Sequence, residues 1–298
     1  MNAFQGLKRR WSRRRVDAAT SIFADTLQAG EIWEKRRRSA ARWGVWGGVL
    51  GALVALVWFA PAAWLAGAVA LATGERVQLA EARGTIWDGS AVLVFAGGAG
   101  SRDAATLPGR LEWQLRPKGT ALLVTARHAC CLFGATTIRI EPGIGRQTIV
   151  LPSAPAGIGQ WPAAVLSGLG TPWNTLQLGG TLRLASPGAR IELLQGRWRL
   201  DGQLTLDLNS ISSRVSTLDE LGSYRVLISG QPGSSENANL QLSTLGGSLQ
   251  VNGQGQWVGP KLRFRGEASS AQGAEQALNN LLNIIGRRQG ARSVISIG

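Results

Sequence analysis

The sequence predicts a mainly β protein, in which an N-terminal cytoplasmic helix and a single transmembrane helix precede a large, curled antiparallel β-sheet. Three observations predict this order: a basic beginning, an uncharged apolar stretch over residues 43–73, and strand-like alternation over most of the remainder. We therefore divide the chain into a basic cytoplasmic segment (1–42), a membrane anchor with a juxtamembrane helix (43–72) and an exported β-rich domain (73–298). The sheet of that domain is expected to be an open barrel or sandwich-like, with one short C-terminal helix.

The composition of the 298 residues excludes several classes of protein. Lys and Arg number 32 and Asp and Glu 18, so the net charge is +14. A hydrophobic content of 44% is too high for an intrinsically disordered chain. With one His and two Cys, the chain lacks the residues for a conventional zinc site, and the lone His leaves little for a Ser-His-Asp triad.

Basic residues gather at the beginning of the chain. Residues 1–42 hold 11 Lys and Arg and four acids, a net charge of +7, and two basic runs flank an amphipathic stretch over residues 16–34. Such runs beside an apolar segment fix its orientation and attract anionic lipid, and this context argues against a nucleic-acid partner. The residues expected to meet lipid headgroups or to set the topology are Arg13, Arg14, Arg15, Lys35, Arg36, Arg37 and Arg38.

The apolar stretch that follows has the length of a membrane span. Residues 43–60 would extend for about 27 Å as a helix, close to the roughly 30 Å of a bilayer's hydrocarbon core. Pro61 should end or kink this helix, which then continues over residues 62–71. A cleaved signal peptide is the competing interpretation, but the basic region and the apolar run are both too long for one. The tryptophans expected at the two membrane interfaces are Trp43, Trp46, Trp58 and Trp64.

The exported part reads as β structure. Four segments share a glycine followed by alternating large apolar residues, at 109–113, 180–184, 202–206 and 247–251. Their spacing is irregular, so they do not predict a solenoid. Period-two alternation would put Leu204, Leu206 and Leu208 on one face of the sheet, with polar residues on the other. Turns between strands are expected at the Gly and Pro clusters 97–98, 142–143, 152–159, 187–188 and 232–233.

Near the C-terminus the period changes from two to that of a helix. Residues 274–285 predict a short helix, and Gly286 is well placed to end it. Residues 293–297 alternate again and predict a last strand that closes the sheet. The apolar side of the helix would consist of Ala277, Leu278, Leu281, Leu282 and Ile285.

No group of residues predicts catalysis, a cofactor or a metal site. His128 and Cys130 would share a face of a strand, but two ligands do not complete a metal site. Cys130 and Cys131 are interpreted as small packing residues; a redox or metal role and contacts between chains are the alternatives. Acidic neighbours such as Asp219 and Glu220 are expected at the surface. The glycines of residues 97–100 lack the Lys and Ser or Thr of a phosphate-binding loop, so we expect a hairpin or a break in a strand there.

Several strings, in a fixed order over roughly residues 45–298, resemble the type II secretion system protein N family. They are 82–91 (ARGTIWDGSA), 107–115 (LPGRLEWQL), 221–225 (LGSYR), 242–249 (LSTLGGSL), 253–257 (GQGQW) and 281–288 (LLNIIGRR). The basic N-terminal segment is longer than is common in that family, which leaves open an additional contact with lipid or the cytoplasm.

This resemblance implies a single-pass protein of the bacterial inner membrane, with a cytoplasmic N-terminus and a periplasmic C-terminal domain. It implies a structural part of the machinery that exports folded proteins from the periplasm, with no known reaction or cofactor. The expected partners are the other subunits of the inner-membrane platform and the periplasmic subunits. An alternative function is lipid handling, with an acyl chain in an apolar β trough as the ligand.

The residues expected to contact a partner are Trp87, Trp113 and Trp257, because aromatic side chains are enriched at interface hot spots. The alternative for all three is packing in the core. Contact could also use an exposed strand edge, which recruits another strand through backbone hydrogen bonds.

Overall fold

The computed structural model of the chain describes residues 43–194, 197–231, 238–258 and 261–298. It comprises two units, Met1–Phe59 and Ala60–Gly298. In the first unit, residues 43–58 form a helix whose side chains are all exposed. Within the described residues, no helix has both the length and the apolarity that crossing a membrane requires. The expected helix and basic runs of residues 1–42 lie outside the described part of the chain.

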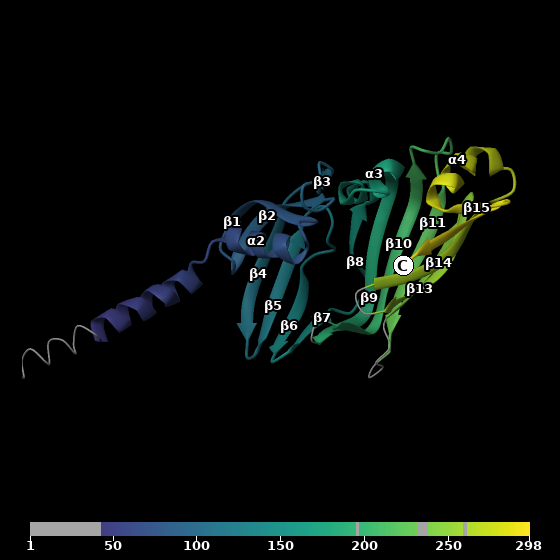
Figure 1. Cartoon of the computed structure of the whole chain (residues 1–298). Coiled ribbons are helices and arrows are strands. Elements are labelled where there is room, and N and C mark those ends of the chain that lie inside the picture. Colours follow the sequence, from purple (N-terminus) through teal and green to yellow (C-terminus); the bar gives the residue numbers. More distant parts are fainter. Residues whose placement is uncertain (1–42, 195–196, 232–237, 259–260) are drawn as a thin grey trace, which may run out of the picture. The chain divides into compact units, whose positions relative to one another are not determined.

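The second unit is built on one 16-stranded sheet in which every pair of neighbouring strands is antiparallel (Figure 1). The strands are β1 (Val77–Gly84), β2 (Asp88–Ala96), β3 (Ala104–Thr106), β4 (Leu111–Lys118), β5 (Ala121–His128), β6 (Thr136–Gly143), β7 (Arg146–Leu151), β8 (Ala154–Pro162), β9 (Leu178–Leu194), β10 (Arg197–Ser213), β11 (Gly222–Gly230), β12 (Asn239–Gly246), β13 (Leu249–Val258), β14 (Lys261–Ser270), β15 (Arg287–Gln289) and β16 (Arg292–Ile297).

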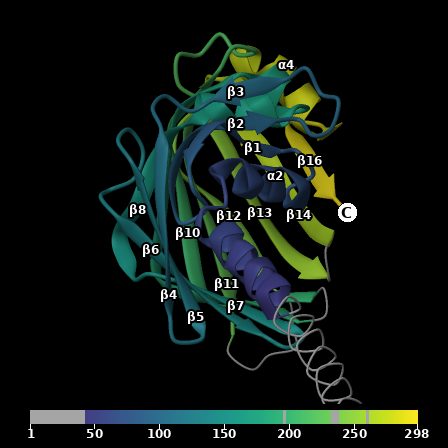
Figure 2. The ribbon, with the colours of Figure 1, turned by 90° about the vertical axis from the view of Figure 1, so that its left-hand side faces the viewer.

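The sheet is open. Its order runs β1-β2-β4-β5-β6-β7-β9-β10-β11-β12-β13-β14-β16-β15, with β3 paired to β2 and β8 to β9. Nearly all neighbours in this order are also neighbours in the sequence, which is the pattern of a meander built from hairpins. Figure 2 shows that the sheet is curled, as expected from the right-handed twist of its strands. The predicted large, curled antiparallel sheet is confirmed.

Four helical segments lie against this sheet: α2 (Ala62–Ala72), the 3₁₀ segment η1 (Ala163–Leu169), α3 (Trp173–Leu176) and α4 (Glu275–Ile285) (Figure 1). Pro61 stands immediately before α2 with an extended backbone, so the apolar stretch is interrupted there as predicted. The C-terminal helix begins one residue later than predicted and ends at Gly286. Gly286 is extended, and a side chain there would meet the carbonyl oxygen of Val294 at 2.6 Å, so close packing accounts for this glycine.

The largest apolar cluster lies where α4, α3 and η1 cover strands β9 to β14. Its α4 residues are the fully buried Leu278, Leu281 and Leu282, while Ala277 and Ile285 are half-buried. A second cluster joins α2 to β1, β2 and β4 through Ala62, Ala91 and Trp113. Helices therefore complete the core at both ends of this open sheet, since an isolated sheet leaves its apolar face exposed.

The recurrent Gly-x-Leu segments have a conformational explanation. In all four, the glycine has a positive φ: Gly109 (97°), Gly180 (99°), Gly202 (103°) and Gly247 (122°). These are values that residues with a side chain seldom adopt. At Gly202 a Cβ would also meet the carbonyl oxygen of Gly188 at 2.5 Å. The repeated glycine marks a bend or bulge at which an apolar strand face begins.

Two of the predicted turns are wrong. Residues 152–159 were expected to be a loop, but most of them belong to β8, which pairs with β9. Residues 187–188 were also expected to be a turn, but β9 continues through Pro187 and Gly188, and its register with β10 shifts nearby. A β-bulge accommodates a proline and a positive-φ glycine without ending the strand. The predicted turn at 232–233 lies outside the described residues.

Candidate functional site

Two of the strings that carry the family resemblance meet at the β1 end of the sheet. Gly89 of β2 pairs with Trp113 of β4, and the indole Nε1 of Trp113 donates a hydrogen bond to the carbonyl oxygen of Ile86 at 3.2 Å. A Cβ on Gly89 would lie 2.6 Å from Cζ2 of Trp113. The glycine of the first string therefore makes room for the tryptophan of the second.

The segment before β2 is held by a threonine. The Oγ1 of Thr85 accepts hydrogen bonds from the backbone N–H groups of Trp87 at 3.2 Å and Asp88 at 3.1 Å. The N–H of Thr85 in turn donates to the carbonyl oxygen of Asp88 at 2.8 Å. This arrangement is a side-chain-stabilised turn, and it fixes the position of Trp87.

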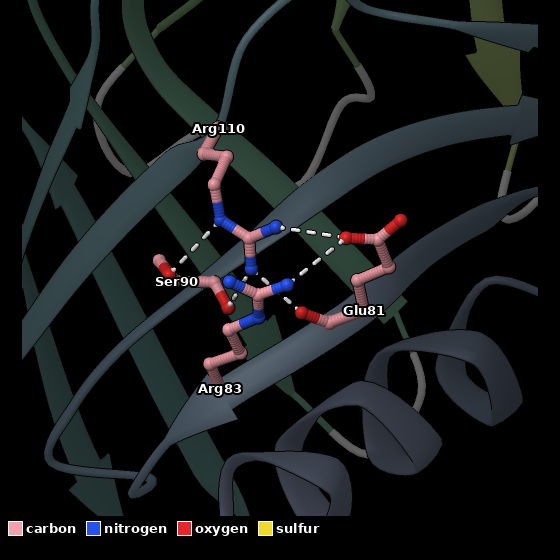
Figure 3. A network of polar contacts seen from close by, with 4 residues as sticks. All are labelled: Glu81, Arg83, Ser90 and Arg110. Atoms are coloured by element: carbon pink, nitrogen blue, oxygen red, sulfur yellow. Dashed lines mark hydrogen bonds and ion pairs between the residues drawn. The ribbon is translucent and has the colours of Figure 1, made fainter.

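An arginine network lies beside this turn (Figure 3). Arg110 donates through Nε to Oγ of Ser90 (3.2 Å), through Nη2 to the carbonyl oxygen of Glu81 (2.6 Å) and through Nη1 to Oε2 of Glu81 (3.2 Å). Arg83 also approaches Oε2 of Glu81, at 3.7 Å. Glu81 has a φ of 49° and lies at the bulge where the β1–β2 register shifts. Arg110 thus satisfies a carbonyl that the bulge removes from the ladder.

The outer edge of β1 is only partly protected against pairing with another strand. β1 stands at one end of the strand order, and no described strand pairs with its outer edge. The bulge and the charged Glu81 and Arg83 interrupt the C-terminal half of that edge, which is a common defence against unwanted strand pairing. Residues 77–80 keep a regular register with β2. At Val77, however, the backbone N–H donates to Oγ1 of Thr73 at 3.1 Å, and the carbonyl oxygen lies 3.2 Å from the same hydroxyl. Residues 78–80 are thus the part of this edge on which another strand could pair.

An apolar cavity of about 780 Å³ opens beneath α4. It lies between α4, α3, β16 and strands β10 to β13, and its lining includes Leu176, Leu242 and Ile295. Tyr224 also lines it, but the hydroxyl of Tyr224 donates to the carbonyl oxygen of Leu249 at 3.0 Å. Burial first, and the negative charge of Glu220 second, raise the pKa of Tyr224 well above its ordinary value. Arg287 is the one charged residue among the lining residues.

A third feature lies at the end of β5, where a tight turn brings together the residues His128, Cys130 and Cys131. Their ligand atoms are all within 4.8 Å of one another. Cys130 and Cys131 are joined by a disulfide. His128 is 5% exposed, and neither of its ring nitrogens has a hydrogen-bond partner among the described residues. Burial lowers the pKa of His128, because it disfavours the charged ring.

The predicted partner-contact tryptophans lie in three different environments. Trp113 is 4% exposed and belongs to the core, as the alternative interpretation expected, so its effect on a surface would be indirect. Trp257 is half-buried and packs edge-on against Trp198, with ring centroids 5.3 Å apart. Trp87 is half-buried, and its backbone N–H is bonded to the side chain of Thr85. The structure does not bring these three side chains into one surface patch.

The tryptophans predicted for a membrane interface are exposed. Trp43, Trp46 and Trp58 of the helix 43–58 are 78%, 70% and 70% exposed, and Trp64 of α2 is 53% exposed. The basic residues predicted to meet lipid, 13–15 and 35–38, lie outside the described residues.

Sequence reasoning missed two features of the candidate site. Arg110 was present in the string LPGRLEWQL, but its role depends on a bulge in β1 that alternation does not reveal. The cavity was missed because its lining comes from segments as distant as Leu176 and Ile295. The one signal for it in the sequence was the apolar side of the helix predicted over residues 274–285, because that side had to pack against another apolar surface.

Comparison with known proteins agrees with the family resemblance that the sequence strings indicate. A family model described as type II secretion system (T2SS), protein N, matches residues 75–295. No curated protein and no solved structure matches the chain. The matched range extends from the turn before β1 into β16, and it includes the Trp113 cluster, the Arg110 network and most of the residues that line the apolar cavity. The chain therefore belongs to the type II secretion system protein N family.

Proposed function

We propose that this protein is an inner-membrane-anchored structural component of the type II secretion machinery, which contributes to the export of folded proteins from the periplasm across the outer membrane. The observation that carries the proposal is the family match over residues 75–295, nearly the whole of the second unit. In this proposal the protein has no catalytic activity and acts by holding partners in place.

The proposed anchor is the uncharged stretch 43–72, with the basic segment 1–42 in the cytoplasm and residues 73–298 in the periplasm. The exposed apolar side chains of the helix 43–58 support this assignment, because large exposed apolar surfaces mark sites of contact with a membrane or a partner. The positive-inside rule gives the orientation. A reporter fused after Gly298 should be active in the periplasm, and the intact chain should resist extraction with carbonate. Cytoplasmic reporter activity would reverse the orientation.

The proposed partner surface is the outer edge of β1 at residues 78–80, together with the half-buried Trp87. Backbone pairing at a sheet edge gives an adhesive contact that needs no catalytic side chain. Other subunits of the inner-membrane platform, or periplasmic subunits, are the expected partners. A photo-cross-linking amino acid at Gln78 should capture a secretion subunit in living cells. The same group at Lys118, in the β4–β5 hairpin, serves as the control and should capture none.

The role itself is tested by deletion of the gene in the source bacterium. Folded exported enzymes should accumulate in the periplasm, and a plasmid copy should return them to the medium. Normal secretion after deletion would refute the proposed role.

Lipid handling remains a second candidate, and the apolar cavity favours it. A volume of about 780 Å³ lies within the roughly 300–1,000 Å³ of ordinary ligand pockets. An acyl chain would fit its lining, and an anionic headgroup would fit Arg287. Against a continuous trough, α4 and α3 cover much of the apolar face of the sheet. Altered detergent sensitivity with normal secretion in the deletion strain would favour this candidate.

A further inference from the structure

The turn that follows β5 holds a group of donor atoms that the secretion role does not use. His128 ends β5, and its carbonyl oxygen accepts hydrogen bonds from the N–H groups of Cys131 and Leu132, both at 3.2 Å. This turn places both cysteines beside the imidazole of His128. From the sequence, two donors on one strand face were expected; the structure adds the third, with all ligand atoms within 4.8 Å.

Backbone hydrogen bonds with β8 hold this turn in position. The N–H of Gln160 donates to the carbonyl oxygen of Cys131 at 2.9 Å, and the N–H of Phe133 donates to the carbonyl oxygen of Ile158 at 3.1 Å. Cys131 is 2% exposed and packs with Leu107 and Val165. Cys130 is exposed, so solvent reaches one side of the group. The backbone of the site is therefore held in position before any ligand binds, which favours a specific binding site.

The unpartnered imidazole of His128 is a second observation, separate from the distances, that points to a ligand. A buried imidazole normally has a partner for at least one nitrogen, because an unsatisfied buried polar group costs free energy. His128 is 95% buried, yet neither Nδ1 nor Nε2 has a partner within the described part of the chain.

We propose that, in the reduced chain, Cys130, Cys131 and His128 bind one Cu(I) ion. Thiolates are soft donors that favour Cu(I), imidazole is also a suitable ligand for copper, and Cu(I) is stable with two or three ligands. Zn²⁺ in a structural site requires four ligands, and this group offers three. The disulfide form lacks thiolates, so binding depends on the redox state of the two cysteines.

Binding of Cu(I) requires that the disulfide is first reduced. A dithiol, the reductant that we name, transfers two electrons and two protons to the Cys130–Cys131 disulfide and itself becomes a disulfide. Cu(I) then displaces the two thiol protons and forms bonds to both sulfur atoms and to one nitrogen of His128.

The test titrates the full-length protein with Cu(I) under anaerobic conditions, against a chromogenic Cu(I) chelator. After reduction with a phosphine that is then removed, the wild type should bind one Cu(I) per chain. The untreated disulfide form should bind none. Cys130→Ser changes an exposed side chain, so the fold should be kept while stoichiometric binding is lost. His128→Ala should keep both sulfur ligands but remove the nitrogen ligand. Binding should weaken by about tenfold or more, since even the loss of a residue that only supports a metal ligand has an effect of this size.

X-ray absorption at the copper edge provides a readout that a merely structural role would not change. Two sulfur atoms and one nitrogen are expected for the wild type, and the nitrogen should be lost in His128→Ala. Equal Cu(I) binding by the reduced and disulfide forms would overturn the proposal, as would full binding by Cys130→Ser. Preferential binding of Zn²⁺ over Cu(I) would overturn the choice of metal.

Discussion

Tyr224 of β11 donates a hydrogen bond from its hydroxyl to the backbone carbonyl oxygen of Leu249, the first residue of β13, at 3.0 Å. The bond connects two strands that are separated by β12 in the sheet. Tyr224 is 5% exposed and lines the apolar cavity beneath α4. This contact therefore connects two strands of the cavity wall and satisfies the hydroxyl of Tyr224.

Tyr224 is the one tyrosine of the chain, so its ionisation can be followed directly. Burial and the charge of Glu220 raise the pKa of Tyr224 above its ordinary value near 10. Below that pH neither folded nor unfolded Tyr224 ionises. Above it the unfolded state loses the proton first, so the free energy of unfolding should fall by about 1.4 kcal/mol per pH unit from this group.

The measurement is the ultraviolet absorbance of tyrosinate during an alkaline titration, with circular dichroism recorded in parallel. Tyrosinate should appear only when the fold is lost, whereas the chain in urea should titrate near the ordinary value. A tyrosinate signal near pH 10 in the folded protein would contradict the buried position of Tyr224.

Gly89→Ala should destabilise the β1 end of the sheet. Its new methyl group would lie 2.6 Å from Cζ2 of Trp113 and 2.8 Å from the carbonyl oxygens of Arg83 and Thr85. Overpacking of this kind costs about 1–3 kcal/mol. Gly246→Ala is the matched control, because a Cβ there meets no atom within 4 Å. Urea unfolding of both variants measures the difference, and equal midpoints would contradict the packing described for Trp113.

Leu282→Ala should loosen α4 from the sheet. Leu282 is fully buried, and its carbonyl oxygen accepts a hydrogen bond from the buried hydroxyl of Ser293. Removing such a side chain costs about 2–5 kcal/mol. Ile284→Ala, on the same helix, changes a side chain that is 45% exposed and should cost much less. Thermal or urea unfolding compares the two, and a larger loss in Ile284→Ala would show that α4 packs through its other face.

Leu242→Trp should fill part of the apolar cavity. If the cavity takes an acyl chain, a fluorescent fatty acid should bind the wild type and should bind this variant less tightly. Leu245→Trp, on the same strand and 52% exposed, lies outside the cavity lining and is the control. Equal binding by all three proteins would place the fatty acid elsewhere on the chain.

Local patterns in the sequence predicted most of the secondary structure, because alternation and helical periodicity are local properties. The Gly-x-Leu segments marked real strand faces, and residues 274–285 gave α4 to within one residue. Pro187 and Gly188 misled the prediction because a β-bulge tolerates both residues inside a strand. In such cases the pairing partner decides the structure, and the sequence of one strand does not reveal its partner.

The candidate sites were less predictable for the same reason. The contact of Gly89 with Trp113 and the bond from Arg110 to Glu81 join residues that are about 24 and 29 positions apart, so they depend on register. Cys131 was separated from His128 in the strand pattern, and a turn unites them. The strings that carry the family resemblance include Gly89, Arg110 and Trp113, but the strings do not reveal the contacts of these residues.

Loss of the gene will show whether this protein acts in type II secretion. The activity of an exported enzyme is measured in the medium and in the periplasm of the deletion strain, carrying either an empty plasmid or a wild-type copy. A resident periplasmic enzyme serves as the leakage control. We predict that the exported enzyme, folded and active, accumulates in the periplasm and returns to the medium with the wild-type copy. Unchanged distribution of the enzyme in the deletion strain would contradict this account.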